Sequence, residues 1–306
     1  MAIKVYADAG SNLFSDIVKM KNLDITVVPM NLYVGDKLYR CYEDKIDINK
    51  FSKSFYQDMK DGKEVRTSLI NPNDFYELFI KDVKNGHQVF CFTMAKGISG
   101  TYQSACIARD MVNDEVGKEM VYVCDSATAG FGEGLQAIHI ARLAKKGMSF
   151  EDLQKEAETY KFRVRSEFTV DDVRYLVKTG RVSKTAARIA NILRIKVLLK
   201  GSDESKIVLT GKVPGRLLAI RKLANQVVEH IVHPDKHTIY ITHCDCYKDA
   251  YKLAELLHKQ GLYNIEIYPY DVVTGAHIGP NSLAIFYVGN NRDLPSDKKE
   301  KEKDEK

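Results

Sequence analysis

The sequence predicts a two-domain α/β fold, with an N-terminal Rossmann-like domain built on a parallel sheet and a second α/β domain that carries some antiparallel strands. Short apolar runs alternate along the chain with amphipathic helix patterns, and this alternation is typical of layered folds with a parallel sheet. In the middle of the chain, two strand patterns flank a turn sequence, which indicates an antiparallel hairpin. The length of 306 residues is enough for two domains.

The predicted strands are short runs that are rich in Val, Ile, Phe and Tyr. Many of them are nearly continuous in these residues, as expected for strands that are buried on both faces. In chain order they cover residues 3–7, 25–30, 88–94, 120–124, 238–242, 265–270 and 283–288. The predicted hairpin joins residues 195–199 to residues 206–209 through Gly-Ser-Asp-Glu at 201–204.

Several predicted helices in the first half begin at a capping signal. Residues 71–74 are Asn-Pro-Asn-Asp, which supplies a cap, a proline at the first helical position and an acid in the first turn. This helix is expected to end near Gly86, and a second helix to begin near Gly100. A third helix is expected over about 132–147, and Ser149 with Asp152 starts a fourth.

The end of the fourth helix places the predicted domain boundary near residue 160. We therefore expect one domain over 1–160 with the Ser99 loop, and a second over 161–290 with the His277 loop. Residues 291–306 form a predicted tail, whose last eleven residues are charged after an initial serine. Such a segment cannot bury a core, so we expect it to be disordered.

The composition excludes several classes of protein. The chain has 46 Lys and Arg against 41 Asp and Glu, and a net charge of +5 is too small to indicate nucleic-acid binding by itself. It would suit weak, transient contact with an anionic membrane surface. No segment reaches the ~18 consecutive apolar residues of a spanning helix, and no signal peptide is recognised. Six scattered cysteines indicate no disulfide framework, so a cytoplasmic location is expected.

The first candidate site is the loop Gly97-Ile-Ser-Gly-Thr-Tyr102, directly after the predicted strand that ends at Met94. Ligands bind beyond the carboxyl ends of the strands in open parallel sheets. Glycines let the backbone approach a ligand, and the following helix directs free N–H groups and its positive dipole end to the same place. Ser99 and Thr101 add hydroxyl donors. The loop could bind an anion, although either hydroxyl could simply cap the helix.

Three further segments place polar groups beside predicted strands or helices. Thr67-Ser68 precedes the helix cap at Asn71, and Asp125-Ser126 follows a strand, where such residues either face a cleft or cap the next helix. His277 lies between glycines in a predicted tight loop. There it could donate a hydrogen bond to an anion, act as a general base, or be an ordinary surface histidine.

Other chemistry finds little support in the sequence. Position 101 is Thr, so the loop lacks the G-x-S-x-G pattern of a hydrolase nucleophile, and no nucleotide P-loop is present. His243, Cys244 and Cys246 lack the second matched pair of a zinc site, so no metal is expected.

Taken together, these segments resemble the DegV family of bacterial lipid-binding proteins over about residues 1–290. The matching segments follow the family's order: Thr67-Ser68 before Pro72, Ser-Gly-Thr-Tyr-Gln-Ser-Ala at 99–105, Asp125-Ser126, Leu-Val-Lys-Thr-Gly-Arg-Val at 176–182, and His-Ile-Gly-Pro-Asn at 277–281. The chain departs from the family at Ala9, where the family has Ser after Asp, and at Asn281, where Gly is more common.

The resemblance implies a fatty acid lying between or within two α/β domains, with its carboxylate bound by Ser99, Thr67 and His277. It also implies a non-catalytic carrier that presents the long-chain fatty acid to a separate ATP-dependent kinase subunit, which makes acyl phosphate. No cofactor other than the bound fatty acid is implied. The candidate ligand-binding residues are Ser99, Thr67, His277, Gly100, Thr101, Ser126 and Gly279. Arg181 is given no ligand role, although it belongs to a matching segment.

Two alternatives stay open. One is a serine hydrolase acting on lipid esters, in which Ser99 and His277 would have covalent roles. The other is a lipid-responsive regulatory protein without a kinase. The basic residues Arg216, Arg221 and Lys222 lie on one predicted helix and could contact a kinase or anionic lipid, or form a solvated helix face.

Overall fold

The computed structural model describes residues 2–42, 48–182 and 195–292. The strands are β1 (Ile3–Asp8), β2 (Ile25–Val28), β3 (Met30–Val34), β4 (Lys37–Cys41), β5 (Val65–Thr67), β6 (Gln88–Thr93), β7 (Val121–Asp125), β8 (Val164–Val170), β9 (Ile195–Gly201), β10 (Ile207–Pro214), β11 (Ile239–His243), β12 (Ile265–Pro269) and β13 (Leu283–Val288). The helices are α1 (Ser15–Met20), α2 (Ile48–Lys60), α3 (Pro72–Lys84), α4 (Thr101–Val116), α5 (Phe131–Lys145), α6 (Phe150–Tyr160), α7 (Arg174–Lys178), α9 (Arg216–His230), α10 (Tyr247–His258) and α11 (Val272–Ile278).

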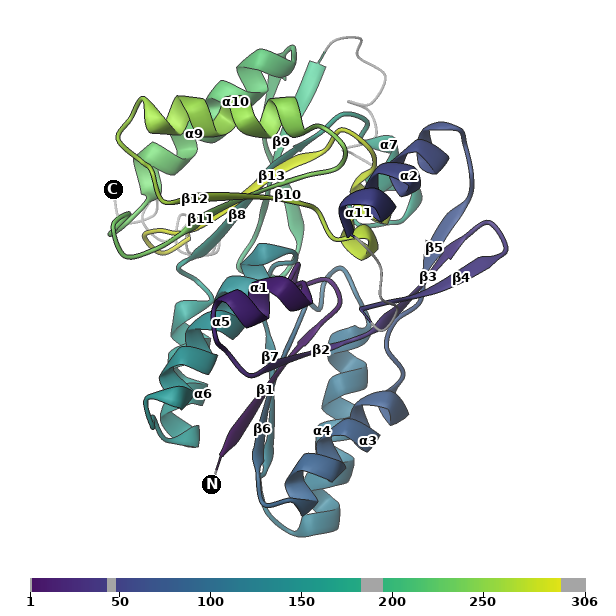
Figure 1. The fold of residues 1–306 in the computed structure, drawn as a ribbon, viewed down its shortest axis with the longest axis vertical. Coiled ribbons are helices and arrows are strands. Elements are labelled where there is room, and N and C mark those ends of the chain that lie inside the picture. The colour runs from purple at the N-terminus through teal and green to yellow at the C-terminus, as the bar shows by residue number, and fades with distance from the viewer. Residues whose placement is uncertain (1, 43–47, 183–194, 293–306) are drawn as a thin grey trace, which may run out of the picture.

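The first half of the chain forms a parallel sheet with the strand order β2-β1-β6-β7. Helices α3 and α4 pack on one face of this sheet and α5 packs on the other (Figure 1). Because both faces are covered, Phe90, Cys91 and Phe92 of β6 are all fully buried. The cap at Asn71 forms as predicted, with its side chain accepting the backbone N–H of Asn73.

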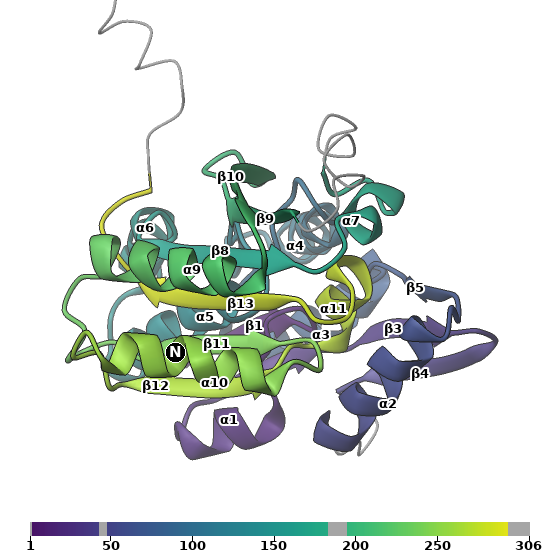
Figure 2. The same cartoon turned by 90° about the horizontal axis from the view of Figure 1, so that it is seen from above.

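The second half forms a mixed sheet with the order β10-β9-β8-β13-β11-β12, in which only β11 and β12 pair in parallel. Helices α9 and α10 lie over its outer face (Figure 2). The opposite face packs on α5, which also contacts β1, so α5 is enclosed between the two sheets. Small residues such as Gly132, Gly134 and Ala137 suit a helix that is buried all round. The predicted α/β class with parallel and antiparallel parts is thus observed.

A third sheet, β4-β3-β5, was not predicted. The predicted strand over 25–30 is in fact two strands, because Pro29 has no backbone N–H to continue the ladder. After Pro29 the chain leaves the parallel sheet and forms β3, which pairs with β5 and brings Thr67 opposite Leu32. Helix α11 packs against β3 and β5 (Figure 2).

The hairpin of β9 and β10 forms where it was predicted, but its strands extend to Pro214. Most of the predicted tail, residues 293–306, lies outside the described residues, and the boundary near residue 160 stays a prediction. Loops after β6 and β7, the turn between β9 and β10, and helix α11 all meet where the two large sheets face each other. This convergence positions the candidate site.

Candidate functional site

A cavity of about 240 Å³ opens beside the loop that follows β6, and we call it the first cavity. Polar side chains from four separate segments line it: Thr67, Ser68, Ser99, Arg181, Thr274 and His277. The rest of its wall is largely apolar, with Met30, Met94, Ile98, Leu176, Val273 and Ile278. A cavity with this lining can take a molecule that has one polar end and one apolar end.

Ser99 is half-buried on the wall of the first cavity, just before α4 begins. Its Oγ accepts the backbone N–H of Thr101 at 3.2 Å and donates to Thr101 Oγ1 at 3.0 Å. Ser99 therefore does contribute to the start of α4, which was the alternative interpretation of this loop. Gly100 also lines the cavity and is the cap residue of α4, so free N–H groups of that helix lie close to Ser99.

His277 and Thr67 meet across the first cavity, 210 residues apart in sequence, with His277 Nε2 2.8 Å from Thr67 Oγ1. The prediction that His277 lies in a tight loop is wrong, since it occupies the last turn of α11. Burial lowers the pKa of His277 to about 4, and the positive charge of Arg181 contributes to this shift. The imidazole is therefore neutral near pH 7. Its buried Nδ1 has no hydrogen-bond partner among the described residues.

Arg181 lies on the cavity wall, a position that the residue pattern did not predict. Its Nε donates to the carbonyl of Ile98 at 3.1 Å, and its Nη1 donates to the carbonyl of Thr179 at 2.5 Å. The side chain thus joins the end of α7 to the loop that carries Ser99. Burial lowers the pKa of its guanidinium. The matching segment at 176–182 was the only signal for it in the sequence.

Three of the predicted ligand-binding residues do not line the first cavity: Thr101, Ser126 and Gly279. Ser126 is fully buried, and its Oγ donates to the carbonyl of Thr128, so it shapes the loop after β7. Gly279 ends α11 with a φ of 82°, and a Cβ there would lie 2.4 Å from the ring of Tyr175. Backbone conformation and space therefore explain this glycine.

A second cavity of about 40 Å³ adjoins the first, and most of the residues that line it are buried. The two cavities share the wall residues Ile98, Ala129, Ile207, Thr274 and Ile278. The second cavity lies between the two large sheets, and its wall includes Phe168 of β8 and Tyr270, which comes after β12. A ligand whose polar end is near Ser99 can therefore extend its apolar end along these shared residues into the second cavity.

Three fully buried carboxyl groups lie close to the first cavity: Asp8, Glu133 and Asp271. Glu133 Oε1 accepts the N–H of Asp8 at 2.9 Å, and Asp8 Oδ2 accepts the N–H of Met94 at 2.8 Å. Asp271 caps α11 by accepting the N–H of Thr274 at 2.7 Å. Burial raises the pKa of Asp8 to about 6 and that of Asp271 to about 7, and it raises the pKa of Glu133.

Of the three basic residues predicted to share a helix face, two are exposed to solvent and one is engaged in contacts within the protein. Arg216 forms an ion pair with Asp249 at 2.8 Å and donates to the carbonyl of Asn281, whereas Arg221 and Lys222 are exposed on α9. Within residues 2–42, 48–182 and 195–292, no group of three or more His, Cys, Asp or Glu side chains could bind a metal ion. In the same ranges no helix combines the length and the apolar character needed to cross a bilayer.

Comparison with solved structures supports the fold. A structure described as fatty acid binding of a DegV family protein from Thermus thermophilus has a TM-score of 0.81 at 21% identity, covering 94% of this chain and 100% of that one. The fatty acid binding DegV family protein from Streptococcus agalactiae has a TM-score of 0.81 at 24% identity, covering 95% of this chain and 100% of that one. The Streptococcus pneumoniae Fatty Acid Kinase (Fak) B3 protein loaded with linoleic acid has a TM-score of 0.77 at 20% identity, covering 95% of this chain and 100% of that one.

Sequence comparison covers nearly the whole chain. A DegV domain-containing protein from Clostridium perfringens is 31% identical over 290 residues, which span 94% of this chain and 98% of that relative. The family model described as "Uncharacterised protein, DegV family" matches residues 2–290. The chain therefore belongs to the DegV family.

Proposed function

We propose that the protein binds a long-chain fatty acid, with its carboxylate bound by Ser99, Thr67 and His277, and presents it to a separate ATP-dependent kinase subunit that forms acyl phosphate. One observation carries the fatty-acid proposal: the first cavity has polar donors on its wall and adjoins a second, mainly apolar cavity with which it shares wall residues. The fatty acids named for the related solved structures support the same ligand class.

The polar side chains suit a carboxylate. When His277 Nε2 carries the proton and donates to Thr67 Oγ1, the Thr67 hydroxyl proton is free to donate to the ligand, so the neutral imidazole takes part in carboxylate binding through Thr67. Ser99 offers a second hydroxyl beside the start of α4, where the helix dipole favours an anion. Hydrogen bonds to a charged group are stronger than neutral ones, so these contacts would orient the ligand.

The acyl chain would supply most of the affinity. At roughly 0.8 kcal/mol per buried CH₂, about fourteen methylenes contribute ~11 kcal/mol before the costs of ordering and association. The carboxylate contacts then determine which end of the molecule faces the surface. Near the surface, the acid would be accessible to a second protein that transfers phosphate to it. The kinase in this proposal is supported by the likeness to the Fak B3 protein.

The geometry does not favour a serine hydrolase. A nucleophilic serine needs a base within hydrogen-bond distance, and that base needs a group to orient it. His277 Nε2 is paired with Thr67, and His277 Nδ1 has no hydrogen-bond partner among the described residues that would orient the ring as a base for Ser99. Covalent labelling of Ser99 by a fluorophosphonate probe would nevertheless overturn the carrier proposal in favour of the enzyme.

Lipid identification tests the ligand class directly. The purified protein is denatured, the extract is analysed by mass spectrometry, and delipidated protein is titrated with palmitate and oleate. We expect a retained long-chain fatty acid and binding of one acid per chain. A protein that retains no lipid and binds neither acid would refute the proposal.

Ser99→Ala tests the carboxylate assignment. Loss of one hydrogen bond to a charged group should weaken fatty acid binding about tenfold, because such a bond contributes roughly 1.5 kcal/mol or more. Ser149→Ala is the matched control, since Ser149 caps α6 through its hydroxyl and does not line either cavity. Equal affinities for the Ser99→Ala and unaltered proteins would contradict the assignment.

Reconstitution tests the kinase partner. Fatty acid, ATP and a candidate kinase subunit are mixed with and without this protein, and acyl phosphate is trapped with hydroxylamine. We expect product only in the complete mixture. Product formed without any kinase would indicate an enzyme, and binding without product for every candidate kinase would favour a lipid-responsive regulatory protein.

A further inference from the structure

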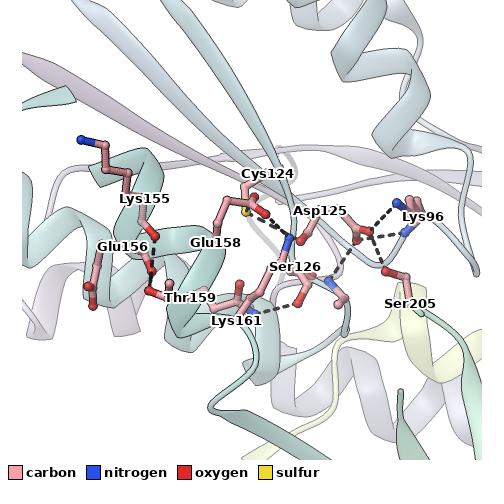
Figure 3. Close-up of polar contacts among 12 residues, drawn as sticks. Lys96, Cys124, Asp125, Ser126, Lys155, Glu156, Glu158, Thr159, Lys161 and Ser205 are labelled. Atoms are coloured by element: carbon pink, nitrogen blue, oxygen red, sulfur yellow. Dashed lines mark hydrogen bonds and ion pairs between the residues drawn. The ribbon is translucent and has the colours of Figure 1, made fainter. Parts of the chain in front are cut away.

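The turn between β9 and β10 is fastened to the first half of the chain by a buried hydrogen bond. Ser205 Oγ donates to Asp125 Oδ2 at 2.6 Å, and these residues are 3% and 7% exposed (Figure 3). The other carboxylate oxygen of Asp125 accepts the backbone N–H groups of Lys96 and Ala127, at 3.2 and 2.9 Å. Asp125 therefore joins three loops that come from different parts of the chain.

Two further contacts fix the same turn. Arg292 forms a buried ion pair with Asp203 at 3.4 Å and donates to the carbonyl of Ala127 at 3.1 Å. Gly97 lies so close to the turn that a Cβ would be 2.2 Å from the backbone oxygen of Ser205. The turn is thus seated on the loops after β6 and β7, at the carboxyl ends of the parallel strands.

The attachment of this turn affects both cavities, because the end of the turn and the start of β10 form part of their walls. Ser205 and Lys206 line the second cavity, and Ile207 lines both cavities. Ile207 is the first residue of β10 and lies two residues from the hydrogen bond to Asp125. The position of this wall therefore depends on the turn remaining against Asp125.

We propose that Asp125 is a positioning residue that, through Ser205, holds Ile207 against the inner part of the ligand path and so determines how strongly the protein discriminates between acyl chain lengths. The inference rests on the proposed function and deepens it. A short acyl chain ends in the first cavity, where Ile207 is the part of this wall that it meets, because Ser205 and Lys206 line the second cavity and not the first. A longer chain reaches the second cavity, where each methylene adds affinity only if the wall packs on it.

The experiment measures affinities for saturated fatty acids from laurate to stearate. For the unaltered protein, we expect affinity to rise along the series. In Ser205→Ala the affinity for laurate should stay within about twofold, while stearate should bind about tenfold more weakly, the contribution of roughly two methylenes. Ile207→Ala should also weaken stearate more than laurate, because it removes part of the wall of both cavities and leaves the turn bonded to Asp125.

Tyr6→Phe is the matched control. Tyr6 donates its hydroxyl to Asp82 at 2.6 Å, the same length as the bond from Ser205 to Asp125, and neither Tyr6 nor Asp82 lines a described cavity. This variant should preserve the full rise of affinity with chain length. The comparison separates a general loss of stability from a loss of acyl selectivity.

The possible failures can be told apart. If Ser205→Ala weakens all the acids by the same factor, the hydrogen bond is only structural and the positioning role is refuted, while the proposed function stands. If both Ser205→Ala and Ile207→Ala discriminate between chain lengths as strongly as the unaltered protein, the positioning role is also refuted. If the unaltered protein binds none of the acids, both the proposed function and this inference are wrong.

Discussion

At the scale of single residues, the neutral imidazole of His277 gives the site its dependence on pH. Its pKa is lowered to about 4 because the ring is buried and Arg181 is near. A carboxylate bound beside it would favour the protonated ring, because an opposite charge stabilises the charged form. Ligand binding and protonation of His277 should therefore be linked.

We predict that saturating fatty acid raises the pKa of His277. The ring resonances of the unliganded and saturated protein are followed by NMR during a pH titration, and we expect a rise from about 4 on binding. His243 is an internal control, since burial also lowers its pKa to about 4 and it does not line either cavity. An unchanged pKa for His277, or equal shifts for both histidines, would contradict binding of the carboxylate beside His277.

Residue types and spacing left the roles of Ser99, Thr67 and His277 open, and the resemblance to the DegV family selected them as a set. The structure brings these three residues to one cavity. The resemblance also gave Ser126 as a ligand-binding residue, but its hydroxyl donates to the carbonyl of Thr128 within the loop after β7. It also gave Arg181 no ligand role, because the direction of a long side chain depends on tertiary contacts. The structure alone shows that this guanidinium lies on the cavity wall.

At the scale of elements, the main error of prediction concerns α11. This helix has only seven residues, too few for a recognisable hydrophobic period, and it contains Gly275. The glycine is needed because a Cβ would lie 2.0 Å from the hydroxyl oxygen of Tyr56 on α2. Packing between distant segments thus stabilises the helix that carries His277, and the cap at Asp271 is a local signal for its start.

The cap of α11 leads to a prediction about stability. The pKa of Asp271 is raised to about 7 by burial, so the folded protein keeps this carboxyl protonated at pH values at which the unfolded chain has already lost the proton. Folding favours the protonated form, and the resulting stability is present below the unfolded pKa and lost as pH rises through about 7. Asn in this position keeps a capping oxygen and cannot ionise.

We therefore expect Asp271→Asn to stabilise the protein more at pH 8 than at pH 5, by about 2 kcal/mol of unfolding free energy. Urea unfolding of both proteins at the two pH values measures the difference. Asp152→Asn is a suitable control, because the pKa of this exposed acid is lowered rather than raised. The same benefit of Asp271→Asn at both pH values would show that Asp271 does not titrate in this range.

At the scale of the whole molecule, the path through the two cavities lies between sheets that fold from different halves of the chain. The shared wall takes Ile98 and Ala129 from the first half, and Ile207 and Ile278 from the second. Helix α5 is packed against both sheets as well. The alternation of strands and helices predicted both layers, but their facing arrangement depends on side-chain packing across the interface, which periodicity does not encode.

A ligand in this position should stabilise both sheets together. At a free fatty acid concentration 100 times the dissociation constant, the free energy of unfolding should rise by about 2.7 kcal/mol, because the ligand binds only the folded protein. Hydrogen exchange of β6 and β13 amides reports on the two sheets separately, and we expect the slowest amides of both to gain the same protection. At the same ligand concentration, Ser99→Ala should gain about 1.4 kcal/mol less if its affinity is tenfold lower. Added protection confined to one sheet would mean that the ligand binds one layer only, because a molecule that contacts both walls must be released before either sheet can unfold.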